Sequence, residues 1–154
     1  DFERAIEDLE FASKLVAGKP DTIEPDGLPN ALNIPISSLQ TNIWYHLGLA
    51  YYLQQDWKNA WRAFEAGFQA GNNDDNRVST THWRYMILRR MEREKEAASV
   101  VAGITPDMEI IENHIYHRLC LFYAGRITAD EVTEDDQDNP TNSAAAYGLA
   151  NWAL

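Results

Sequence analysis

Apolar side chains recur at three- and four-residue intervals through most of this 154-residue sequence, a spacing that places them on one face of an α-helix. The clearest example is the segment 41–73, which predicts a helical hairpin. Asp56, just before its second helix, suits an N-cap. Gly48 is small enough to let a neighbouring backbone approach closely, and Ala60 is small enough to let the second helix pack tightly against the first. The two apolar faces are formed by Trp44, Leu47, Gly48, Tyr51, and then by Ala60, Phe64 and Phe68.

Weaker copies of this pattern lie on both sides of the clear hairpin. The segments 79–105 and 111–137 each predict a degenerate helix pair, and the polar stretch 71–77 between the first two pairs is predicted to be a connector. The ends, 1–18 and 142–154, each predict one amphipathic helix, which is half of such a unit. We therefore expect stacked hairpins flanked by half units, in a chain that is part of a longer protein.

The segment 19–40 interrupts the helical pattern with four of the chain's six prolines, which excludes a continuous helix. Apolar residues are spread through it, unlike in disordered segments. We expect an ordered loop that packs on the helices, with a turn at 24–27. Two interpretations stay open: the loop covers apolar surface, or it shapes a binding site.

The clear hairpin resembles the tetratricopeptide repeat, a helix-turn-helix unit of about 34 residues. Six of the eight usual marker positions match, at Trp44, Leu47, Gly48, Tyr51, Ala60 and Phe64, whereas Gly67 and Asn72 replace the last two. The chain is similar to bacterial tetratricopeptide-repeat proteins of unassigned function. This resemblance implies an all-α superhelix of stacked hairpins that serves as a non-catalytic scaffold for a protein or peptide.

The resemblance also implies which side chains meet that partner, because the first helix of each unit lines the concave face of such arrays. The implied face is aromatic with little charge, which suits an extended peptide or a helix with apolar anchors. The alternative is that these aromatics are buried against the insertion or a neighbouring unit. The implied positions are Tyr45, Leu49, Tyr52, Trp83, Ile87, Arg90, His114, His117, Leu121, Ala145, Leu149 and Trp152.

Charge and composition narrow the classes of partner. With 24 acidic against 13 basic residues, the formal net charge of -11 disfavours nucleic acid and favours a neutral or cationic partner. No run approaches the roughly 20 apolar residues of a membrane span. Cys120 is the single cysteine, so no internal disulfide forms. The sequence allows either a cytoplasmic or an exported protein.

Candidate chemistry is sparse. His114 and His117 stand three residues apart, with Glu112 nearby, and could share a metal on one helical face, but no third ligand is fixed by spacing. Cys120 takes the place of the packing glycine, which predicts a buried, unreactive thiol. We therefore predict no enzyme, no cofactor and no metal. The alternatives are a histidine-based metal site and a structural module that self-associates, its half units completed by another copy.

Overall fold

The computed structural model describes residues 1–24, 30, 32–133 and 142–153, and these residues fold as an all-α structure, as predicted. They contain no strand, and an isolated bridge pairs Ile23 with Ser38. No helix within these ranges has the length and apolar character needed to cross a bilayer. The helices are α1 (Phe2–Val16), α2 (Leu39–Leu53), α3 (Trp57–Ala70), α4 (Asp74–Arg90), α5 (Glu94–Val101), α6 (His114–Tyr123), α7 (Ala129–Thr133) and α8 (Asn142–Trp152).

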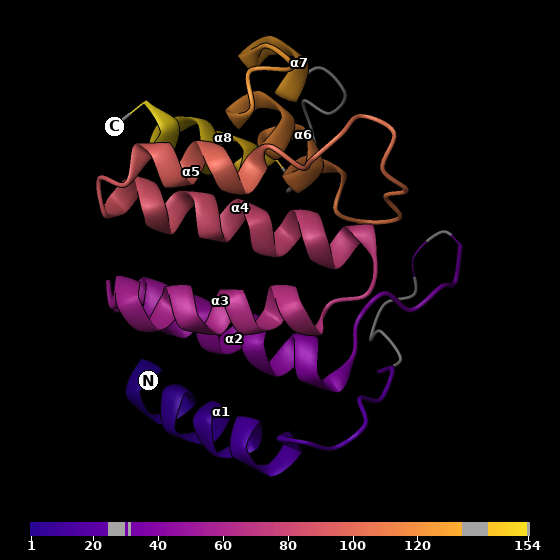
Figure 1. Cartoon of the computed structure of the whole chain (residues 1–154), viewed down its shortest axis with the longest axis vertical. Coiled ribbons are helices and arrows are strands. Elements are labelled where there is room, and N and C mark those ends of the chain that lie inside the picture. The colour runs from indigo at the N-terminus through magenta and orange to yellow at the C-terminus, as the bar shows by residue number, and fades with distance from the viewer. Residues whose placement is uncertain (25–29, 31, 134–141, 154) are drawn as a thin grey trace.

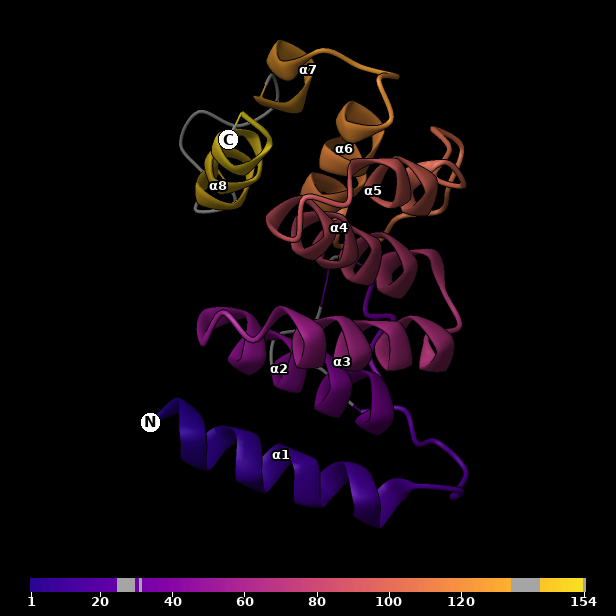
Figure 2. The ribbon, with the colours of Figure 1, turned by 60° about the vertical axis from the view of Figure 1, so that its left-hand side comes forward.

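The helices lie side by side in one stack that runs from α1 at one end to α7 at the other (Figure 1). Each of α1 to α4 packs on the helix that follows it in sequence, and α4 also packs on α6. Helix α8 does not extend the stack, because it lies alongside α6 and also contacts α4 (Figure 2). As a result α2, α4, α6 and α8 share one side of the array, which we call the first-helix face.

Side-chain caps fix where the central helices begin. Ser38 and Thr41 form a reciprocal capping box at α2, in which each side chain accepts a hydrogen bond from the other's backbone N–H, at 3.2 and 2.8 Å. The predicted N-cap of α3 is confirmed, since Asp56 accepts from the backbone N–H of Asn59 at 3.1 Å. These caps satisfy donors that the first helical turn leaves unpaired.

Helix α4 begins earlier than predicted, so most of the polar stretch 71–77 is helix rather than connector. The Asn73 side chain caps it by accepting from the N–H of Asn76 at 2.8 Å. Asp74 and Asp75 occupy the first turn, where negative charge interacts favourably with the helix dipole. A polar sequence can therefore start a helix when its charges match the helix terminus.

Two glycines admit large side chains into the core. A Cβ at Gly48 would lie 2.6 Å from Cε2 of Phe64, so the group closest to this glycine is a side-chain ring and not the backbone that was predicted. In α8, a Cβ at Gly148 would lie 2.7 Å from Cδ2 of Leu119. Phe64 and Leu119 are both fully buried. The space left by the missing side chain of each glycine is therefore filled by a buried apolar side chain from a neighbouring helix.

The described part of the 19–40 segment packs on the helices through Ile36, whereas the apolar side chains of Ile23, Leu32 and Ile34 are exposed, so the predicted packing holds only in part. Ile36 is buried, and its carbonyl accepts a hydrogen bond from Nδ2 of Asn73 at 2.8 Å. The N–H of Leu39 donates to the carbonyl of Thr22 at 2.8 Å, which closes the base of the loop. The turn predicted at 24–27 lies, apart from Glu24, outside the described residues.

Candidate functional site

Five aromatic residues from four helices meet on the first-helix face, and we call them the aromatic cluster: Tyr45, Tyr52, Trp83, Tyr116 and Tyr147. Trp83 of α4 lies among them, with its ring centroid 5.0 Å from that of Tyr52, 6.5 Å from that of Tyr116 and 6.4 Å from that of Tyr147. Such distances are typical of favourable edge-on and tilted aromatic contacts. The cluster therefore joins α2, α4, α6 and α8.

The polar atoms of the cluster satisfy one another. Nε1 of Trp83 donates to the Tyr45 hydroxyl at 3.1 Å, and that hydroxyl lies 3.3 Å from the hydroxyl of Tyr116. The Tyr147 hydroxyl donates to that of Tyr52 at 3.1 Å. Burial raises the pKa of Tyr45 and of Tyr52, and the neighbouring tyrosine hydroxyls add to the effect. The hydroxyls therefore stay neutral donors and acceptors at physiological pH.

A cleft of about 210 Å³ opens beside the cluster, at the N-terminal ends of α2 and α4. Its walls are formed by residues of the 19–40 segment, by residues of α2 and α4, and by residues of the segment that precedes α6. We call it the polar cleft, because amide, hydroxyl, imidazole and carboxylate groups line it together with one aromatic wall. Its lining includes Asn42, Tyr45, His46, Asn76, Thr80 and Glu112.

A buried carboxylate holds the wall of the polar cleft that precedes α6. Asp75 is 1% exposed, and its oxygens accept hydrogen bonds from three consecutive backbone N–H groups. The donors are Ile111 at 2.9 Å, Glu112 at 2.9 Å and Asn113 at 2.7 Å. Three such bonds offset much of the desolvation of a buried charge. Asp75 therefore fixes the backbone from which Glu112 reaches the cleft.

The remaining groups of the cleft are positioned by local hydrogen bonds. Nδ1 of His46 lies 2.9 Å from the carbonyl of Asn42, so Nδ1 carries the proton and Nε2 of the neutral ring is an acceptor. His46 is exposed. Glu112 accepts from Nδ2 of Asn30 at 2.6 Å, which links the cleft to the 19–40 segment. The cleft thus presents an accessible imidazole and an accessible carboxylate.

The structure brings some of the predicted partner-binding residues together. Tyr45, Tyr52 and Trp83 belong to the aromatic cluster, although Tyr52 is buried. Leu49 is half-buried and packs on the same core. Arg90 is exposed at the edge of the cluster, where its positive charge partly offsets the rise in the pKa of Tyr52.

Other predicted residues lie away from the aromatic cluster. His117 is buried, with Nε2 2.8 Å from the carbonyl of Thr105, and Leu121 is buried in a small second core with Cys120. His114 is exposed at the start of α6. Trp152 is 43% exposed, with its ring edge-on to Phe122 at 4.9 Å. The buried positions Ile87 and Ala145 complete the core rather than a surface.

Two members of the cluster, Tyr116 and Tyr147, were not predicted to belong to the binding face. In the spacing of the repeat, Tyr116 occupies the position of Trp44, and Tyr147 occupies that of Leu47, which is not one of the positions implied to face a partner. In the structure their hydroxyls bond to Tyr45 and Tyr52 instead. The signal that could have identified them is their residue type, because a tyrosine that packs its ring against neighbours can also form a hydrogen bond through its hydroxyl.

Two groups with potential for chemistry, His82 and Cys120, are fully buried in the core. Burial lowers the pKa of His82 to about 3, so this imidazole is neutral at physiological pH. Cys120 is buried as predicted, and burial raises the pKa of its thiol. Within the described ranges, no three His, Cys, Asp or Glu side chains gather closely enough to hold a metal ion.

Comparison of the chain with models of known protein families, with curated proteins and with solved structures finds no match.

Proposed function

We propose that this protein is a non-catalytic module that binds an extended peptide segment of a partner protein along the first-helix face, anchored in the polar cleft. The observation that carries the proposal is the polar cleft itself, about 210 Å³ in volume and continuous with the aromatic cluster through Tyr45. The resemblance of the clear hairpin to the tetratricopeptide repeat supports the same class of function.

The chemistry of the cleft suits a peptide backbone. Every peptide unit carries a carbonyl acceptor and, except at proline, an N–H donor. Glu112 offers an accessible acceptor for such an N–H, and His46 presents its Nε2 as an acceptor when neutral and a donor when protonated. Tyr45 adds an aromatic wall against which one side chain of the peptide packs.

The exposed aromatic residues beyond the cleft extend the binding surface. Tyr147 and Trp152 of α8 are each 43% exposed. A peptide anchored in the cleft and lying along the aromatic cluster reaches α8 next. The net charge of -11 favours a peptide that is neutral or cationic.

A peptide display selection tests this proposal without knowledge of the natural partner. Selected peptides are synthesised and their affinity is measured by calorimetry. His46→Ala removes an exposed imidazole from the cleft and is expected to weaken binding about fivefold or more. The matched control is His114→Ala, which removes an exposed imidazole outside the cleft and is expected to leave affinity unchanged. Equal effects of the two substitutions would refute the cleft assignment.

A second candidate function, self-association, is favoured by the exposed apolar side chains of α1. Phe2, Phe11 and Leu15 are 47%, 64% and 52% exposed, and α1 has no buried residue. Isolated exposed apolar residues are ordinary, but Phe11 and Leu15 are four residues apart and share one face of α1, which forms an apolar pair that another copy would cover. Light scattering across a concentration series tests this function. It predicts oligomers that Phe11→Glu dissociates, whereas a strict monomer at high concentration eliminates it.

A further inference from the structure

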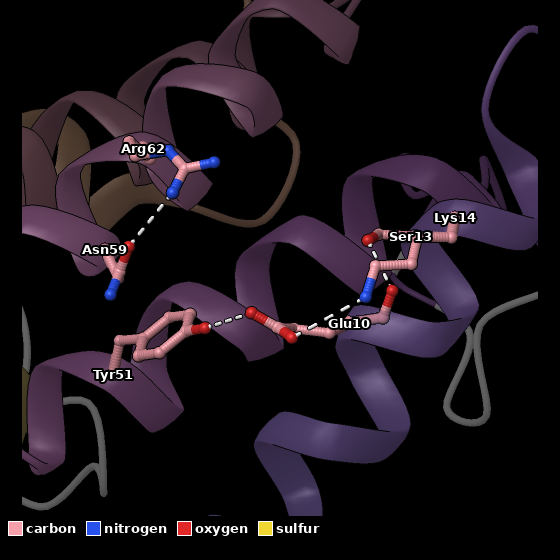
Figure 3. Close-up of polar contacts among 6 residues, drawn as sticks. All are labelled: Glu10, Ser13, Lys14, Tyr51, Asn59 and Arg62. Carbon is pink, nitrogen blue, oxygen red and sulfur yellow. Dashed lines mark hydrogen bonds and ion pairs between the residues drawn. The ribbon is translucent and has the colours of Figure 1, made fainter.

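A second cavity, of about 250 Å³, opens between α1 and the α2–α3 hairpin. Each helix contributes one stripe of side chains, and Figure 3 shows the polar ones, with Glu10, Ser13 and Lys14 of α1 facing Asn59 and Arg62 of α3. The stripe of α2 consists of Trp44, Leu47 and Tyr51, whereas the polar cleft uses Asn42, Tyr45 and His46. The two sites therefore occupy different faces of α2.

The floor and walls of this cavity are apolar and partly accessible. Leu47 and Ala63 are buried at its base, whereas the rings of Trp44 and Tyr51 are half-buried and keep part of their surface free. Space remains because α3 has only alanine at positions 63 and 66, where a longer side chain would fill the gap toward α1. An apolar floor flanked by two aromatic rings favours a flat apolar ligand group.

On the α1 side of the rim, Glu10 is already engaged. It accepts a hydrogen bond from the Tyr51 hydroxyl and lies 3.9 Å from Nζ of Lys14. Burial, reinforced by the Glu10 carboxylate, raises the pKa of Tyr51 to about 12, so its hydroxyl remains a donor to Glu10. The Glu10 charge is thus balanced locally by Lys14.

On the α3 side, Arg62 is positioned by a neutral partner and is exposed to solvent. Its Nη1 donates to Oδ1 of Asn59 at 3.1 Å, and Asn59 is in turn held by Asp56, to which its Nδ2 donates at 2.7 Å. Among the residues that the structure describes, no carboxylate forms an ion pair with Arg62. An accessible guanidinium beside an apolar cavity can pair with an anionic ligand group, and arginine suits a carboxylate in particular.

We infer that this cavity binds a small aromatic carboxylate, with its ring against Trp44 and Ala63 and its carboxylate paired with Arg62. The volume agrees with that class of ligand. An apolar protein cavity of about 150 Å³ holds benzene. The 250 Å³ here therefore accommodates a ring with a short acid chain.

The test titrates the whole chain with 3-phenylpropanoate and follows the indole N–H signals by NMR. Saturable shifts at Trp44 are expected at millimolar ligand. The neutral analogue 3-phenylpropanamide and the ringless acid hexanoate are both expected to bind more weakly. If the Trp44 signal does not move, or if the amide binds as tightly as the acid, the inference is overturned.

Two variants separate the charge from the cavity. Arg62→Gln is expected to weaken 3-phenylpropanoate binding about fivefold or more, since a charged hydrogen bond is lost at a partly solvated rim. Arg4→Gln on the exposed part of α1 removes the same charge elsewhere and is expected to leave binding unchanged. Ala66→Leu fills the cavity and is expected to abolish binding, with circular dichroism confirming the fold. Equal affinities of Arg62→Gln and Arg4→Gln would contradict the inference even if Ala66→Leu failed to fold.

Discussion

Nε1 of Trp83 donates a hydrogen bond to the hydroxyl of Tyr45 at 3.1 Å, across the contact between α4 and α2. The ring of Trp83 also stacks on Phe64 of α3 at 5.8 Å, with an interplanar angle of 12°. One side chain thus ties its own helix to both helices of the preceding hairpin. Because Tyr45 also forms a wall of the polar cleft, this hydrogen bond connects the aromatic cluster to the cleft.

Replacing Trp83 by Phe removes the Nε1–H donor and replaces the indole by a smaller ring. We expect the free energy of unfolding to fall by about 1–3 kcal/mol, the range for losing packing together with a buried hydrogen bond. Urea unfolding of Trp83→Phe, Tyr45→Phe and the double variant gives the coupling between the two residues. A coupling energy near zero would mean that the hydrogen bond contributes nothing to stability.

Gly48→Ala is expected to be destabilising by about 1–3 kcal/mol, because the added methyl group would overlap the buried Phe64 ring. Gly103→Ala is the matched control, since nothing lies within 4 Å of a Cβ placed there. Thermal melts of the two variants provide the comparison. If Gly48→Ala melted no lower than Gly103→Ala, the close packing of α2 on α3 would be wrong.

Asp75→Asn keeps the shape of the side chain but leaves only one acceptor oxygen for three backbone donors. The expected loss of stability is about 2–4 kcal/mol, and hydrogen exchange at residues 111–113 should accelerate. Asp74→Asn is the control, because Asp74 accepts from one backbone N–H, that of Glu109 at 3.0 Å. Unchanged exchange at 111–113 in Asp75→Asn would show that the carboxylate does not hold this segment.

His82 predicts a pH dependence of stability. Burial lowers its pKa from 6.5 to about 3 in the folded protein, so below pH 6.5 the unfolded chain takes up a proton that the folded chain does not. The contribution of the neutral ring is present above pH 6.5 and is lost as the pH falls toward 3. Between pH 7 and pH 5 the loss should be about 2 kcal/mol.

The measurement is urea unfolding of the native protein and of His82→Gln between pH 5 and pH 8. The difference in unfolding free energy between the two proteins should shrink as the pH falls, because the glutamine variant lacks the titrating group. His114→Gln, at an exposed position, should show no such trend. A difference that stays constant with pH would place the folded pKa of His82 near its ordinary value.

The sequence predicted the helices better than the face they form. Periodicity identifies which residues of a helix are apolar, and it located the hairpin around Gly48 and Phe64 together with its cap at Asp56. It does not fix how a degenerate helix is rotated in its stack. The marker spacing assigned His117 to the face, whereas the structure places Tyr116 in the aromatic cluster.

The polar cleft could not be predicted, because it depends on contacts between distant parts of the chain. Asp75 accepts hydrogen bonds from residues 36 to 38 positions away, and Asn30 reaches Glu112 across 82 positions. No short sequence motif indicates either of these contacts. The acidic first turn of α4 indicates only a helix start, so the role of Asp75 becomes visible when the fold brings residues 111–113 over it.

Chemical-shift mapping with a display-selected peptide tests the central claim most directly. If the first-helix face binds an extended peptide, the signals that move at saturation should be the backbone amides of Thr41–His46 and Asn76–Thr80 and the indole N–H of Trp83. Signals on α1 and α7 should remain in place. Shifts confined to α1, or a selection that yields no peptide binding the native chain, would contradict the account.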